Sequence, residues 1–355
     1  MMMKRLPVND HDYVTYPNIA NLFSVIGIRE ETMPWIYTNF IQLVWFDSLR
    51  KIDYTNKLDS FFDPLLFDCP WLNIQFIHRN TISRVWDGSF ARFAVDAIDR
   101  GEYVYFVADQ KYIAQSEAYG KHPHNHDMFI YGYDTATGSF NISDNLKHGK
   151  YTRTECGFDE MELAYAHADA DRDWFDSRVM TVSFKPKTYF QYERYLVFDS
   201  VSVAHSLNRY LHSLKPVSYM CMENTYGIAV YERLQEYLLA LKQEREVVDV
   251  RLLHIVHEHK KMMRRRIRYM LDHGYLLDES LETSYANVEK EHGIWIGLML
   301  KYAVTGDGKM LDRIGGALAE CSATEKELLG RVVATVNHRQ VFYQGGRVHD
   351  HPAVL

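Results

Sequence analysis

The spacing of apolar and polar residues divides the chain into a helical start, a strand-rich middle and a helical end. At the start, Asn18–Ile28 and Trp35–Leu49 repeat apolar residues at helical spacing, and Pro34 suits the first turn of the second helix. The middle is rich in β-branched and aromatic residues, which favour strands. The expected strands are Glu102–Ala108, Asp127–Tyr133, Ser139–Ile142 and Val179–Phe184.

A short loop that contains a glycine, Asp134–Gly138, lies between the second and third of these strands and predicts a hairpin. After about residue 198 the apolar spacing is helical throughout. The expected helices are Val201–Leu214, Tyr226–Leu241, Val250–Asp272, Ser284–Val304 and Thr324–Gln340. Because strands and helices occupy separate parts of the chain, the pattern predicts an α+β fold with an antiparallel sheet.

The length of 355 residues fits two domains at roughly 150 residues each. We expect an α+β domain over residues 1–200, a helical domain over 201–343 and a flexible polar tail over 344–355. Hydrophobic residues make up 47% of the chain, enough for a sizeable core, so a disordered chain is excluded.

Charge and cysteine usage exclude several classes of protein. The net charge of −7 comes without a strongly basic part, which argues against nucleic-acid binding. No apolar run approaches the ~18 residues of a membrane helix, and the first ten residues lack the apolar segment of a signal peptide. The four cysteines form no CxxC pair, so neither a disulfide framework nor a zinc ribbon is expected. We expect a cytoplasmic protein without a cofactor, and a homodimer is left open.

The densest group of chemically active residues is His122-Pro-His124-Asn-His126-Asp127, directly before an expected strand. If that strand pairs with the next one, the ends near His126 and Asp144 lie close together. A carboxylate beside a histidine fixes its tautomer and stabilises the imidazolium, as in catalytic triads. Two other interpretations stay open: solvated histidines at a strand entry, and a metal site formed by His122, His124 and His126.

The run HDMFIYGYD…FNISDN, preceded by the Tyr-rich strand EYVYFVADQKYI, resembles the core of papain-like cysteine enzymes, above all the bacteriocin leader peptidases and the butirosin-type acyltransferases of antibiotic biosynthesis. In those families a His opens a strand that leads into a Gly-Tyr-Asp turn, and an Asp ends the next strand. Here His126, Gly132-Tyr133-Asp134 and Asp144 take those places. The later stretch YFQYERYLVFDSVSVAHSLNRYLHS resembles the substrate-domain entry helix of the acyltransferases. The stretches YGIAVYERLQEYL and LLHIVHEHKKMMRRRIRYM resemble their helical C-terminal half.

The resemblance implies a papain-like domain over 1–200 and amide formation from an acyl or peptidyl thioester on a carrier protein. In such enzymes a Cys takes the acyl group, a His moves the proton, and an Asp orients the His. The implied catalytic residues are His126 and Asp144. We also expect contacts with a small amine or peptide substrate from the strand after His126 and from the segment that matches the family's nucleophile. The residues concerned are Tyr16, Asn18, Tyr131 and Tyr133.

The nucleophile itself is missing from its expected place, because the family's Cys position falls on Tyr16 or Pro17. Thr15 and Ser24 carry hydroxyls nearby, but a hydroxyl is a far weaker nucleophile than a thiolate. Cys69 is the only cysteine before the expected sheet, and a free Cys is more often a small buried apolar residue. The residues therefore allow an acyltransferase that works through a non-standard nucleophile or by direct transfer. They also allow a binding protein or partner subunit that has lost catalysis, or a metal-dependent hydrolase.

Two groups on the expected helices are weaker candidates. Arg264, Arg265 and Arg268 gather on one side of a helix, either as a solvated face paired with acids or as a dock for an acidic carrier protein. His254, His257 and Glu258 share another helix face, a pattern more typical of solvated residues than of a metal site.

Overall fold

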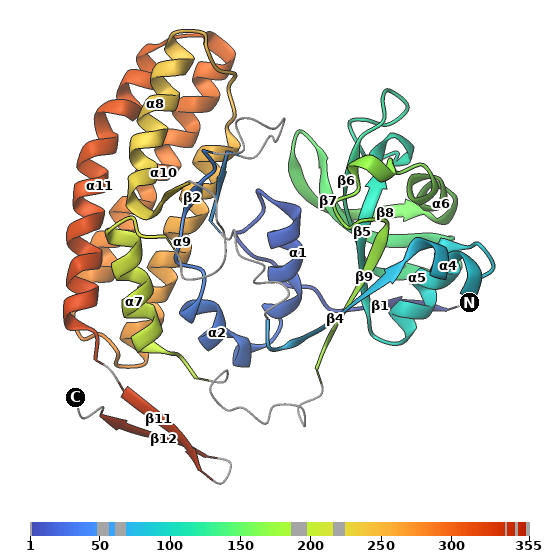
Figure 1. Cartoon of the computed structure of the whole chain (residues 1–355), viewed down its shortest axis with the longest axis horizontal. Coiled ribbons are helices and arrows are strands. Elements are labelled where there is room, and N and C mark those ends of the chain that lie inside the picture. Colours follow the sequence, from blue (N-terminus) through green and yellow to red (C-terminus); the bar gives the residue numbers. More distant parts are fainter. Residues whose placement is uncertain are drawn as a thin grey trace. The chain divides into compact units, whose positions relative to one another are not determined.

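A computed structural model describes residues 2–47, 57–60, 69–185, 197–215, 224–337, 339–344 and 347–352, with side chains up to residue 337. The chain forms two compact units (Figure 1). The first, here called the sheet unit, combines Met1–Glu30 with Leu66–Gln191. The second, the helical unit, combines Glu31–Leu65 with Tyr192–Leu355.

The sheet unit is built on an antiparallel sheet in the order β4-β9-β5-β6-β7-β8, and β1 pairs with β6. The strands are β1 (Met3–Arg5), β4 (Leu72–His78), β5 (Tyr103–Asp109), β6 (Asn125–Asp134), β7 (Ser139–Lys147), β8 (Lys150–Gly157) and β9 (Arg178–Phe184). β5 is buried along its whole length, which explains its run of aromatic and aliphatic residues.

Helices cover both faces of this sheet. They are α1 (Pro17–Ile26), α4 (Arg79–Val85), α5 (Phe90–Asp99) and α6 (Phe158–Ala166), with 3-10 turns η3 (Gln110–Tyr112) and η4 (Ala170–Arg172). Successive strand residues point to opposite faces. Tyr105 lines a small cavity beneath α1, whereas the next residue, Phe106, contacts Phe90 of α5 and Tyr165 of α6. The site described below lies within this unit.

The helical unit is a bundle of long helices (Figure 1). Its main elements are α2 (Met33–Thr38), α7 (Ser200–Leu211), α8 (Val230–Lys242), α9 (Arg251–Asp272), α10 (Ser280–Thr305) and α11 (Lys309–Thr335). Short strands β2 (Val44–Trp45), β3 (Leu58–Asp59) and β10 (Thr225–Tyr226) form a small antiparallel sheet. The 3-10 turns η1 (Glu30–Thr32) and η7 (Gly227–Ala229) precede α2 and α8, and β11 (Arg339–Gln344) pairs with β12 (Arg347–Pro352).

A buried polar cluster joins five helices of this unit at one carboxylate. Glu325 of α11 accepts hydrogen bonds from Lys260 of α9, at 2.9 Å to each oxygen, and both side chains are fully buried. Three tyrosine hydroxyls also donate to Glu325: Tyr210 of α7 at 3.3 Å, Tyr231 of α8 at 2.8 Å and Tyr285 of α10 at 2.5 Å. A buried ion pair is tolerated when further hydrogen bonds satisfy both charges, as they do here.

The structure confirms the α+β prediction, the four expected strands and the hairpin between β6 and β7. The helix expected over Trp35–Leu49 is wrong from Asn39 to Asp47, because the chain continues into β2, whose apolar residues are all buried. Ser48 and Leu49 lie outside the described residues. The last helix begins at Lys309 rather than Thr324.

The expected domain ranges differ from the observed units in three places. The second part of the helical unit begins at Tyr192 rather than at residue 201. The stretch Glu31–Leu65 belongs to the helical unit and not to the expected domain over 1–200, because its partners lie on α7, α8, α9 and β10. The tail expected over 344–355 contributes to a hairpin, since the apolar run Val341–Tyr343 suits a strand.

Candidate functional site

The two expected catalytic residues are in direct contact in the sheet unit. His126 lies at the start of β6 and Asp144 on β7, and the pairing of these strands brings their side chains together. The Nδ1 atom of His126 lies 2.7 Å from Oδ1 of Asp144. Asp144 is fully buried, whereas 24% of the His126 side chain is exposed. Because Nδ1 is committed to Asp144, Nε2 is the ring nitrogen that can exchange a proton with a substrate.

Electrostatics keep a proton on this histidine. Burial disfavours the charged imidazolium, but the charge of Asp144 and its hydrogen bond to Nδ1 outweigh burial and raise the pKa of His126 to about 9. The neighbouring Asp127 accepts hydrogen bonds from Tyr105 and Trp174, and burial raises its pKa to about 6. The imidazole of His126 therefore carries a proton at neutral pH.

Three hydrogen bonds reach the carboxylate of Asp144. Its Oδ1 atom also accepts the backbone N–H of Asn145 at 2.7 Å, and its Oδ2 atom accepts the side-chain amide of Gln110 at 2.7 Å. The Gln110 oxygen in turn accepts the hydroxyl of Ser116 at 2.8 Å. The third bond to the carboxylate is the one from His126. A carboxylate with donors on both oxygens is held in one orientation.

The N-terminus of α1 packs against the same strand end. The side-chain amide of Asn145 donates to the carbonyl of Thr15 at 3.0 Å, one residue before the helix cap at Tyr16. Tyr16 is buried and Pro17 occupies the first helical position. The segment expected to carry a nucleophile thus lies beside the residue that follows Asp144, and it offers a phenol and a proline.

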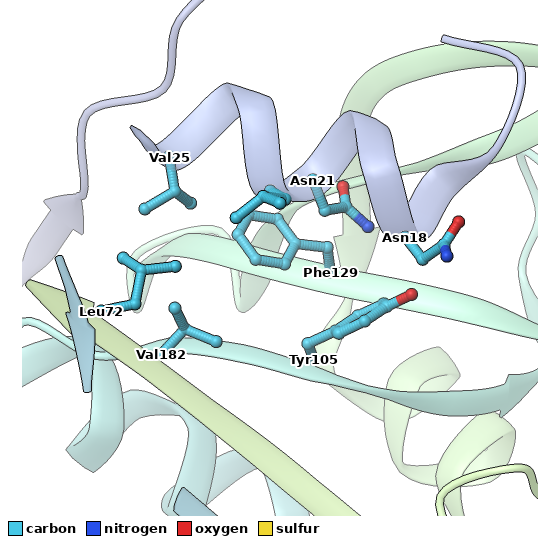
Figure 2. A pocket seen from close by; sticks show the side chains of 8 residues that line it. Asn18, Asn21, Val25, Leu72, Tyr105, Phe129 and Val182 are labelled. Carbon is cyan, nitrogen blue, oxygen red and sulfur yellow. The ribbon is translucent and has the colours of Figure 1, made fainter. Parts of the chain in front are cut away.

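A small cavity lies between α1 and the sheet (Figure 2). Figure 2 shows Asn18 and Asn21 of α1 above the rings of Tyr105 and Phe129. The enclosed space is about 10 Å³, at the lower limit for one water molecule. Asn18 itself is exposed, so it is placed at the edge of this cavity as well as at the surface.

Tyr131 and Tyr133, the other two expected substrate contacts, form hydrogen bonds within the protein. Tyr131 and Tyr133 follow His126 by five and seven residues on β6, roughly 16–23 Å along the strand. Both are buried; the Tyr131 hydroxyl accepts from Arg5 at 3.1 Å, and the Tyr133 hydroxyl donates to Asp99 at 2.7 Å. The structure gives these hydroxyls internal partners rather than a place beside His126.

The remaining nucleophile candidates are buried. Ser24 lies within α1, 1% exposed, and its hydroxyl donates to the carbonyl of Asn21 at 2.7 Å. Cys69 is 1% exposed, and burial raises the pKa of its thiol to about 12, so it carries no thiolate at neutral pH. Cys156 and Cys321 are buried as well, and Cys221 lies outside the described residues.

The described residues offer no metal centre: no group of three or more His, Cys, Asp or Glu side chains is arranged to hold an ion. The rings of His122 and His124 lie 6.2 Å apart, and those of His124 and His126 lie 5.4 Å apart in a stack. On α9, burial lowers the pKa of His254 and of His257, and Glu258 is buried. The metal-hydrolase interpretation gains no support from these side chains.

The basic run on α9 is paired with acids. Arg264 forms ion pairs with Glu282 at 2.6 Å and with Glu289 at 3.2 Å, and Arg268 pairs with Glu279 at 3.0 Å and also with Asp272. Arg265 also has interactions of its own. Two of the three arginines are thus neutralised within the helical unit, as the interpretation of a paired, solvated face requires.

Gln110 and Ser116 are site residues that the sequence reasoning missed. A signal was present, because Asp109 ends the buried strand β5, Gln110 follows it directly, and antiparallel pairing sets Ala108 opposite His126. Polar residues at that end of β5 had to lie near the start of β6.

No family model matches the chain, and no curated protein matches it either. In the described ranges no helix has the length and hydrophobicity that a membrane-spanning segment requires.

Proposed function

We propose that the protein is an amide-forming acyltransferase that moves an acyl or peptidyl group from a carrier-bound thioester to an amine. His126 acts as the general base and Asp144 orients it. The observation that carries this proposal is the 2.7 Å contact between Nδ1 of His126 and Asp144, which leaves Nε2 of a partly exposed ring for the substrate. The papain-like motifs around His126 and Asp144 support the same reaction class.

Direct transfer fits the site better than a covalent intermediate. By the resemblance to papain-like enzymes, Tyr16 and Pro17 take the place of the nucleophilic thiol, and Cys69 is buried and protonated. In the direct route the amine nitrogen attacks the thioester carbonyl while Nε2 of His126 takes a proton from that nitrogen. The C–S bond then breaks, and the imidazolium returns the proton to the departing thiolate.

The raised pKa of His126 gives this route a distinct pH dependence. A general base must be neutral, and His126 holds its proton up to about pH 9. The rate of transfer, measured with amine in excess, is expected to rise with pH and to level off above about pH 9. A rate that is flat between pH 6 and 9 would argue against His126 as the base.

The direct test uses an acyl N-acetylcysteamine thioester, a panel of primary amines and detection of amide product by mass spectrometry. His126→Gln is expected to lower the turnover number by about 10²–10⁴-fold. The matched control is His122→Gln, which changes an exposed histidine of the same segment and is expected to retain activity. An acyl mass shift on the protein itself would contradict the direct route.

A second candidate function is binding without catalysis, which the loss of a thiol at Tyr16 and Pro17 favours. In that case no amine in the panel gives product. An acyl-carrier thioester would still bind, and His126→Gln would leave that affinity nearly unchanged.

A further inference from the structure

We propose that Gln110 is a positioning residue of the site: it fixes the carboxylate of Asp144 so that Oδ1 faces His126. The expected effect of Gln110 on the rate of transfer rests on the proposed function. Its expected effect on the tautomer of His126 does not. Gln110 lies on η3, directly after β5, and is 2% exposed. Gln110 donates to Oδ2 of Asp144, whereas His126 contacts Oδ1.

The amide of Gln110 has only one satisfactory orientation. Its Nε2 donates to Oδ2 of Asp144 at 2.7 Å and to the carbonyl of Asn145 at 3.1 Å, so both of its hydrogens have acceptors. Its oxygen accepts from Ser116 at 2.8 Å. A flipped amide would bring its oxygen against two acceptors, which is repulsive. The Ser116 hydroxyl accepts the N–H of Ala118 at 3.1 Å, so its single hydrogen is directed at Gln110.

This chain of bonds acts on His126 through Asp144. With Gln110 in place, both carboxylate oxygens are engaged, and Asp144 cannot rotate without losing a hydrogen bond in a buried environment. The Nδ1–H tautomer of His126 is therefore enforced, and Nε2 keeps its lone pair when the ring is neutral. Without Gln110, Oδ2 is a buried oxygen with no donor, and the carboxylate is free to turn away from Nδ1.

The test is nuclear magnetic resonance of the full-length protein labelled with ¹⁵N-histidine. In the wild type we expect a downfield Nδ1 proton signal for His126 and, above about pH 9, the Nδ1–H tautomer alone. Gln110→Met keeps the size of the side chain but removes both donors. It is expected to weaken or abolish the downfield signal and to produce a mixture of tautomers. Gln115→Met is the matched control. It is the same substitution five residues away, at a glutamine that forms no hydrogen bond with Asp144.

Ser116→Ala provides a second variant that keeps the Gln110 donors but releases the amide oxygen. It is expected to broaden the same signal to a smaller extent. If Gln110→Met is folded and its His126 spectrum equals that of the wild type, the inference is wrong. If Gln110→Met does not fold, an unchanged spectrum in Ser116→Ala overturns the inference instead.

Activity separates this inference from the proposed function. With an active enzyme, Gln110→Met is expected to lower kcat by about 10- to 100-fold at unchanged KM, because a displaced base loses alignment but not substrate binding. If no transfer is found in the wild type while the tautomer still changes in Gln110→Met, the proposed function fails and the positioning role stands. If transfer is found and the spectrum does not change, the positioning role fails alone.

Discussion

The substitution Asp144→Asn tests the electrostatic basis of the site most directly. It replaces the buried carboxylate by an amide of nearly the same size, so the packing between β6 and β7 is preserved while the charge is removed. The burial of His126 stays, and of the nearby carboxylates only Asp127 then favours the imidazolium.

The expected change follows from the balance of these effects. In the wild type the pKa of His126 is raised to about 9 from its ordinary value of 6.5. Without the charge of Asp144, burial lowers the pKa of His126 and only Asp127 still raises it, so the pKa is expected to fall towards its ordinary value. A fall of about 2.5 pH units corresponds to about 3 kcal/mol of interaction between the imidazolium and the carboxylate.

The assay is a pH titration of the histidine side chains by heteronuclear NMR. The chain has 17 histidines, and the His126 signals are identified by their absence from the spectrum of His126→Gln. The reasoning is refuted if His126 titrates near pH 6.5 in the wild type, or if it still titrates near pH 9 in a folded Asp144→Asn protein.

The same pair has a signature in stability. Because the pKa of His126 is higher in the folded protein than in the unfolded chain, its contribution to the free energy of unfolding is fully present below about pH 6.5. The contribution is lost as the pH rises through about 9. Urea unfolding of the wild type is expected to show this loss between pH 6.5 and 9, and Asp144→Asn is expected to lack it.

Other predictions concern the helical unit and the cysteines. Lys260→Met leaves the charge of Glu325 buried without its partner and is expected to lower the free energy of unfolding by about 3–5 kcal/mol, whereas adding Glu325→Leu is expected to recover part of that loss in urea melts. If the single and double variants are equally destabilised, the pair is not the cause. Gly227→Ala places a Cβ 2.2 Å from the Tyr210 carbonyl oxygen at φ +59° and is expected to cost more than about 2 kcal/mol. Gly306→Ala, at φ +67° with open space around it, is the control and is expected to cost about 1 kcal/mol. The three cysteines of the described residues are buried, so a thiol reagent is expected to label them only under denaturing conditions; rapid labelling of any of them in the native protein, located by peptide mapping, would contradict the burial.

Periodicity predicted most of the elements because their patterns are local. The helix over Val250–Asp272 and the strand over Asp127–Tyr133 were expected nearly at their observed bounds, since each has an uninterrupted apolar pattern. The helix expected over Trp35–Leu49 failed for a tertiary reason. Val44 and Trp45 point to opposite faces of strand β2, and both are apolar because both are wholly buried. Periodicity cannot separate such a buried strand from a buried helix.

The site was predictable in part for the same reason. The hairpin between β6 and β7 is a local signal, so the approach of His126 to Asp144 followed from the sequence. Gln110 comes from another strand end, and only the pairing of β5 with β6 brings it near. Tyr131 and Tyr133 were expected to bind substrate because they are close to His126 in sequence, but their hydroxyls bond to Arg5 and Asp99.

The discontinuous helical unit has a consequence for synthesis on the ribosome. Asp47 bonds to Thr225, 178 residues later, and the carbonyl of Phe40 bonds to Arg266, 226 residues later. At 5–20 residues per second, the early segment waits on the order of 10–40 s for these partners. Throughout that time the side chains of Phe40 and Ile41, which are buried in the finished protein, lack the cover that the later helices provide. The nascent chain is therefore expected to depend on a chaperone more than its final stability would suggest.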